Sequence, residues 1–152
     1  MNVAVGADHA GYQLKETIAA QLRSAGYTVV DVGTHSTDPV DYPDSAAALG
    51  RAILDGEAER GILICGSGAG ASIAANKLKG IRATVAHDTY TAHQSVEHDD
   101  VNVLTLGARV IGVAQAGELV EAFLGAEFTG EERHRRRLDK VKQLEESFGK
   151  PG

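Results

Sequence analysis

The segment 62–71 reads ILICGSGAGA and places a cysteine beside three closely spaced glycines. An apolar run that leads into glycines predicts a strand turning sharply into a helix, since glycine permits tight turns and close approach of the backbone to a ligand. The first turn of a helix also offers N–H groups without partners and the positive end of the helix dipole. We therefore expect an anion site here. Its predicted residues are Gly66, Ser67, Gly68, Ala69 and Gly70.

Cys65 is the only cysteine of the chain and stands between the apolar run and the glycines. The N-terminus of a helix favours the thiolate form of a nearby cysteine, so Cys65 could act as a nucleophile or as a base. The alternative is a small buried residue without a chemical role, which is the commoner fate of a free cysteine. The position beside the glycines favours a functional role.

Three familiar kinds of glycine-loop site are excluded by what the segment lacks. A Walker A loop needs a lysine that is missing here, and the spacing GxGxG does not match the dinucleotide fingerprint GxGxxG. A cysteine phosphatase with a CxxxxxR loop would need arginine where this chain has Ala71. A tight turn with Ser67 as helix cap remains as the alternative to an anion site.

Other candidate residues are distant from Cys65 in sequence. Arg133 and Arg137 are one helical turn apart, so both could reach one phosphate, although surface arginines are usually just solvated. We expect His134, between them, to pack rather than to do chemistry. His98 precedes the fifth apolar run, which predicts a place at the end of the sheet opposite Cys65. It is then either an ordinary loop histidine or part of a site that another subunit completes, which would require a dimer.

Composition limits the class of protein. With 152 residues, 43% of them hydrophobic and 24% charged, the chain is expected to form one globular domain, 1–152. A net charge of −6 argues against a nucleic-acid partner, and no apolar run suits a membrane span or a signal peptide. A single cysteine excludes an internal disulfide, so we expect a cytoplasmic protein. Its histidines and carboxylates show no metal-ligand spacing, and neither a metal nor a cofactor is expected.

Five short apolar runs, each followed by a helical pattern, indicate how the candidate residues are positioned. The runs are 3–6, 27–32, 61–65, 81–86 and 101–106, and the helical patterns are 14–25, 43–55, 69–78, 89–97, 113–124 and a charged C-terminal helix, 130–148. This alternation predicts an α/β fold, a three-layer, doubly wound, Rossmann-like, five-stranded parallel sheet with a C-terminal helix. Ligands bind at the carboxyl ends of such strands. Residues that follow strand ends include Asp8, His9, Cys65 and Arg109.

Taken together, these residues resemble the type B ribose-5-phosphate isomerases and the related galactose-6-phosphate isomerase subunits. The resemblance covers nearly the whole chain. It is carried by Gly6-Ala7-Asp8-His9-Ala10-Gly11, Asp41-Tyr42-Pro43, Ile64–Gly70, Ile73–Lys77, the stretch from His98 to Leu104, and Arg133-His134 with Arg137. It implies a homodimer whose active sites are shared between subunits, and it leaves open whether dimers pair into a tetramer. The C-terminal helix would then pack on the partner.

The resemblance also implies a role for each candidate residue in an aldose–ketose isomerisation of a phosphorylated sugar. Cys65 would move the proton between C1 and C2, while Ser67 and the loop N–H groups would stabilise the enediolate oxygen. His98 would open the sugar ring. The substrate-binding residues would be Asp8 for hydroxyls, and His9, Arg109, Arg133 and Arg137 for the phosphate.

One departure from the family leaves the sugar open. Ribose-type members usually carry asparagine after the ring-opening histidine, whereas this chain has Asp99. Ribose 5-phosphate is the expected substrate. A tetrose 4-phosphate such as erythrulose 4-phosphate, which is open-chain, and a hexose 6-phosphate are the nearer alternatives. A cysteine hydrolase using Cys65 with His98, or a non-catalytic sugar-phosphate-binding module, are more remote ones.

Overall fold

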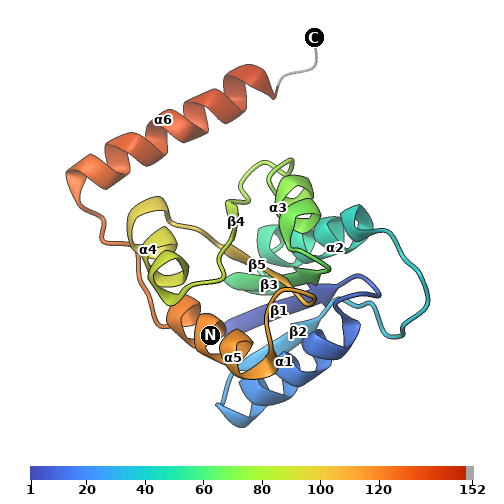
Figure 1. Cartoon of the computed structure of the whole chain (residues 1–152). Helices are drawn as coiled ribbons and strands as arrows, with labels where there is room; N and C mark the ends of the chain where they lie inside the picture. Colours follow the sequence, from blue (N-terminus) through green and yellow to red (C-terminus); the bar gives the residue numbers. More distant parts are fainter. Residues whose placement is uncertain (150–152) are drawn as a thin grey trace.

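A computed structural model of the chain describes residues 1–149. Within these residues five strands alternate with helices, and a sixth helix follows the fifth (Figure 1). The strands are β1 (Asn2–Ala7), β2 (Thr28–Asp31), β3 (Arg60–Cys65), β4 (Ala83–Val85) and β5 (Val103–Gly107). The helices are α1 (Tyr12–Ser24), α2 (Tyr42–Leu54), α3 (Ala69–Ala75), α4 (Thr89–Asp99), α5 (Val113–Leu124) and α6 (Glu132–Phe148).

All strands run parallel, in the order β2-β1-β3-β5-β4. From β1 the chain first winds to β2 on one side and then to β3 on the other. The order therefore reverses between β1 and β3, and a crevice forms at the carboxyl ends of strands that flank such a reversal. This places the residues after Ala7 and those after Cys65 side by side. The N–H of Asp8 accordingly donates to the carbonyl oxygen of Ile64 (3.2 Å).

Helices cover both faces of the sheet, which confirms the predicted three-layer α/β fold. One apolar core joins the sheet to α1, α4 and α5, and the other joins it to α2 and α3. The strands are apolar on both sides because both faces are covered. Val5, Ile62, Ile64, Leu104 and Leu106, for example, are fully buried.

Several predicted boundaries shift by a few residues. The third helix ends at Ala75 instead of residue 78, because Lys77 and Leu78 form turns that lead into Gly80, which has φ +92°. The fourth strand is only three residues long and lies at the edge of the sheet. The side chain of Asn76 extends the pairing there, since its oxygen accepts from the N–H of Ala83 (2.8 Å) and its nitrogen donates to the carbonyl (2.9 Å).

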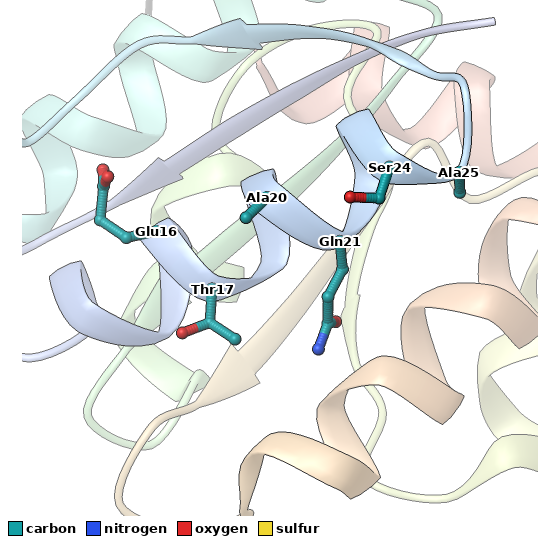
Figure 2. A pocket seen from close by; sticks show the side chains of 6 residues that line it. All are labelled: Glu16, Thr17, Ala20, Gln21, Ser24 and Ala25. Carbon is teal, nitrogen blue, oxygen red and sulfur yellow. The ribbon is translucent and has the colours of Figure 1, made fainter.

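Helix α6 projects away from the sheet and meets the body mainly near α4 (Figure 1). Its apolar residues form a stripe in which Leu138 is buried at 7% exposure, whereas Val141, Leu144 and Phe148 are exposed. A groove of about 660 Å³ separates this stripe from the edge of the sheet. Elsewhere, a shallow depression runs along α1 (Figure 2), and none of the predicted site residues lines it. Within residues 1–149, no helix combines the length and the apolar character that spanning a membrane requires.

Candidate active site

The glycine loop between β3 and α3 is shaped by two glycines that no larger residue could replace without a shift. Gly68 has φ +85°, a conformation that side chains with a Cβ rarely adopt. On β5, a Cβ added to Gly107 would lie 2.6 Å from the carbonyl of Ser67. The loop therefore rests directly on the end of β5. Gly68, and not Ser67, is the N-cap of α3, so the reading of Ser67 as the cap of that helix was wrong.

Cys65 lies at the base of this loop with 5% of its surface exposed. Its Sγ accepts a hydrogen bond from the N–H of Gly68, at 3.1 Å, and the bond would stabilise a thiolate.

The loop keeps N–H groups available for a ligand. The N–H of Gly68 is used by Cys65, and the N–H of Ala69 donates to Ser67 Oγ (3.2 Å). Within the described part of the chain, no acceptor is found for the N–H groups of Gly66, Ser67 and Gly70. Three main-chain donors beside one sulfur can hold an oxygen that becomes negatively charged while the sulfur handles a proton.

Asp8 and His9 follow β1 and lie beside the end of β3, since the N–H of Asp8 bonds to the carbonyl oxygen of Ile64. Asp8 is 7% exposed, and its Oδ1 accepts from the N–H groups of Ala10 and Gly11, at 3.0 and 3.1 Å. These bonds fix the carboxylate and leave Oδ2 for another donor, such as a sugar hydroxyl. Nδ1 of His9 lies 3.1 Å from the nitrogen and 3.2 Å from the carbonyl oxygen of Val40, so the ring is held against this residue in either tautomer.

Arg109 closes another side of the loop. Its main-chain N–H donates to the carbonyl oxygen of Gly66 (3.0 Å), and a Cβ added to Gly66 would lie 3.8 Å from the guanidinium group.

Tyr42 also borders the loop, although no role was predicted for it from the sequence. Its ring packs on Gly70, where an added Cβ would lie 2.8 Å from the ring. The signal in the sequence was its place directly before Pro43, at the start of the predicted second helix. His87 supports the far side, since its Nε2 accepts from the N–H of Gly107 (3.0 Å).

The remaining candidates form a second group. His98 lies in the last turn of α4, with Nδ1 2.7 Å from Nε2 of Gln94, and its ring stacks on His134 with centroids 4.2 Å apart. Arg133 is exposed and pairs with Glu131 (3.1 Å). Asp99 and Arg137 line the groove beside α6.

In one chain these two groups lie apart. Helix α4 begins after β4, at the carboxyl edge of the sheet, where Asp88 caps it by accepting from the N–H of Thr91 (2.8 Å). This cap bond lowers the pKa of Asp88. His98 comes ten residues later, about 15 Å along the helix at 1.5 Å per residue. The predicted separation of His98 from Cys65 within a chain therefore follows from the direction of α4.

No three histidine, cysteine or carboxylate side chains of residues 1–149 come together in a way that could hold a metal ion. The polar groups around Cys65 are instead hydrogen-bond donors, a carboxylate and a guanidinium group. Such a set suits an anionic, hydroxyl-bearing substrate whose carbonyl oxygen becomes negatively charged during the reaction.

Known proteins with similar sequences and structures bear on this site. The family model described as Ribose/Galactose Isomerase matches residues 3–141. Ribose-5-phosphate isomerase B of Escherichia coli is 45% identical over 144 residues, which are 95% of this chain and 96% of that protein. D-erythrulose-4-phosphate isomerase of Pectobacterium atrosepticum is 47% identical over 134 residues, which are 86% of each chain.

Among solved structures, ribose-5-phosphate isomerase B of Clostridium thermocellum superimposes with a TM-score of 0.95 at 47% identity, covering 97% of this chain and 99% of that one. The range matched by the family model includes the glycine loop, α4 and the first part of α6. The resemblance inferred from motifs is thus confirmed over the chain as a whole. The chain belongs to the ribose/galactose isomerase family of sugar-phosphate isomerases.

Proposed function

We propose that this isomerase interconverts ribose 5-phosphate and ribulose 5-phosphate through an enediolate. The observation that carries the proposal is the arrangement at the glycine loop, where the Sγ of Cys65 accepts from Gly68 and the N–H groups of Gly66, Ser67 and Gly70 stay available. A base next to preorganised donors is what proton abstraction beside a carbonyl requires. The names of the relatives in Escherichia coli and Clostridium thermocellum support the choice of sugar.

The chemistry starts from the open-chain aldose. The Cys65 thiolate removes the proton from C2, and the electron pair of that C–H bond forms a C1–C2 double bond while negative charge moves to the carbonyl oxygen O1. The loop N–H groups and Ser67 stabilise that oxygen. O1 then gains a proton and the hydroxyl on O2 loses one, after which the thiol returns its proton to C1. The product is the ketose, with no net gain or loss of atoms.

The other candidate residues bind and prepare the sugar. Oδ2 of Asp8 accepts from sugar hydroxyls, and Nε2 of His9 and the guanidinium of Arg109 bind the phosphate. Holding the phosphate fixes C1 and C2 over the sulfur, and such positioning supplies a large part of enzymatic rate enhancement. His98 transfers protons to open the furanose ring.

A homodimer with shared sites supplies the second group. In their own chain His98 is at the far end of α4 from the carboxyl edge of the sheet, and Arg133 and Arg137 are on α6, so these residues of a partner would complete the crevice of the first subunit. The exposed stripe of α6 (Val141, Leu144 and Phe148) gives such a partner an apolar surface to cover.

A tetrose 4-phosphate is the second candidate substrate. Asp99 lies directly beside His98 and is exposed at the α6 groove. A carboxylate at this place accepts hydrogen bonds but cannot donate them, which changes the hydroxyl pattern that the site selects. The 47% identity with D-erythrulose-4-phosphate isomerase of Pectobacterium atrosepticum favours this alternative over a hexose 6-phosphate.

Turnover of the intact chain and of Cys65→Ala tests the proposal. The intact chain should interconvert the two pentose phosphates and, in D₂O, place deuterium on the carbon beside the carbonyl. Cys65→Ala should lose at least about 10³-fold in kcat, since the base is gone. It should still bind the sugar phosphate, as measured by calorimetry. A comparison of kcat/KM between ribose 5-phosphate and erythrulose 4-phosphate decides the substrate.

Other outcomes identify the rival functions. A burst phase with a covalent acyl-enzyme would favour a cysteine hydrolase. Ligand-induced stabilisation without any turnover by the intact chain would favour a binding module.

A further inference from the structure

His134 is a buried polar residue that the proposed chemistry does not use. It is 3% exposed although both residues beside it, Arg133 and Arg135, are exposed. Its ring stacks on that of His98, with centroids 4.2 Å apart and planes 27° from parallel. Its side chain therefore connects α6 to the last turn of α4.

Hydrogen bonds define the protonation state of this ring. The Nε–H of Arg133 donates to Nε2 of His134 (3.3 Å), and an arginine has no atom that can accept. Nε2 therefore carries no proton. Nδ1 lies 2.6 Å from Oγ1 of Thr129 and donates to it. His134 is thus a neutral ring with its proton on Nδ1.

The charges around the ring favour the same neutral form. Burial lowers the pKa of His134, and His98 from α4 with Arg133 and Arg137 from α6 lower it further. Glu131, which precedes α6, acts in the opposite direction. A neutral His134 can stack on His98 without repelling the positive charge that His98 takes up when it accepts a proton.

We propose that His134 is a positioning residue that holds His98 and Arg133 in fixed relation, stacking on the first and accepting from the second. The inference rests on the proposed function, because it takes His98 as the ring-opening group and Arg133 as a phosphate ligand. The ring-opening group and the phosphate ligand must meet the same sugar from one side. The ring of His134 contacts both His98 and Arg133, and it thereby fixes the distance between them.

Two substitutions separate the two contacts kinetically. His134→Phe keeps an aromatic ring over His98 but offers Arg133 no acceptor, so KM for ribose 5-phosphate should rise about tenfold with kcat within about twofold. His134→Gln keeps an acceptor but loses the ring, so kcat with ribose 5-phosphate should fall about tenfold. With erythrulose 4-phosphate, which needs no ring opening, kcat of His134→Gln should stay within about twofold of that of the unchanged chain. If the two variants changed kcat by the same factor and KM by the same factor, the proposal would be overturned.

Nuclear magnetic resonance tests the same inference without activity. The ¹⁵N shifts of the ring at pH 7 should show His134 protonated on Nδ1 only. Its pKa should rise in Arg133→Met and change less in the matched control Arg136→Met, whose arginine pairs with Glu132 on the exposed side of α6. The ring-current shift of the His98 Hε1 proton should persist in His134→Phe and vanish in His134→Gln.

The two readouts also separate the possible failures. A His134 ring that carries a proton on Nε2 at pH 7, or a His98 signal that is indifferent to both variants, would overturn the positioning role. If the unchanged chain turned over no sugar phosphate while the ring signals were as expected, the result would instead contradict the proposed function.

Discussion

At the scale of single residues, the site depends on a backbone that glycine alone allows. Gly68 takes a left-handed conformation, which costs other residues about 1–2 kcal/mol, and its N–H thereby points at the sulfur of Cys65. Gly107 lets the loop rest on β5 without a Cβ between them. The glycines at positions 68 and 107 thus determine where the sulfur lies relative to the available main-chain N–H groups.

His134 is expected to make stability depend on pH. Its pKa is lowered in the folded chain, whereas in the unfolded chain it returns to about 6.5. Between these two values unfolding takes up a proton, so the free energy of unfolding should fall as the pH falls below about 6.5. Above that pH the residue adds no pH dependence. Urea denaturation between pH 5 and 8 checks this.

His134→Phe is the matched comparison for that prediction. The phenyl ring cannot take up a proton, so the slope of stability against pH should be shallower in this variant below about pH 6.5. Identical slopes in the two proteins would mean that His134 does not carry the effect.

At the scale of elements, the strand ends and helix starts are held by polar side chains. Lys15 of α1 is fully buried, and its Nζ lies 2.7 and 2.8 Å from the two carboxylate oxygens of Asp31, which ends β2. Asp31 also accepts from the N–H of Gly33 (2.9 Å), and the carbonyl oxygen of Gly33 in turn accepts from Ala7 (2.8 Å). This chain of contacts supports the end of β1, from which Asp8 and His9 follow.

Lys15→Met should therefore destabilise the fold by about 3 kcal/mol, because it leaves the carboxylate of Asp31 without its partner in a mostly buried place. The double variant Lys15→Met with Asp31→Asn should recover at least about 1 kcal/mol of that loss, as measured by urea unfolding. Lys79→Met serves as the control. Lys79 pairs with Glu146 on an exposed surface, so its loss should change stability by less than about 0.5 kcal/mol. Additive effects of Lys15→Met and Asp31→Asn would contradict this account.

At the scale of the whole molecule, the proposed function divides the candidate residues of one chain into two groups, one at the glycine loop and one at the end of α4 and the start of α6. The direction of α4 puts His98 away from Cys65, and α6 carries Arg133 and Arg137 away with it. A homodimer would bring the partner's second group to the glycine loop. The proposed chemistry therefore belongs to the assembly and not to one chain.

Mixing two inactive variants tests this directly. Cys65→Ala and His98→Asn should each be inactive on ribose 5-phosphate. After unfolding and refolding together in equal amounts, about half of the dimers contain one chain of each kind, and one of the two sites in each is intact. About a quarter of the normal activity should return. No recovery, with mixed dimers shown by mass spectrometry, would place Cys65 and His98 in the same chain's site.

Much of this protein is determined locally along the chain. Continuous apolar runs such as Ile62–Cys65 specify strands that are buried on both faces, and the glycines after Cys65 specify the turn, because these effects act between near neighbours in sequence. The alternation of the elements then implies a parallel sheet, whose carboxyl edge collects Asp8, Cys65 and Arg109.

Other features required the tertiary structure. The strand order puts β5 between β3 and β4, and only this order brings Gly107 against the glycine loop. The stacking of His134 on His98 and the packing of Tyr42 on Gly70 join elements whose spacing in the sequence carries no signal. Such contacts depend on how whole elements pack around two cores, and a helix pattern alone leaves its angle to the sheet undefined.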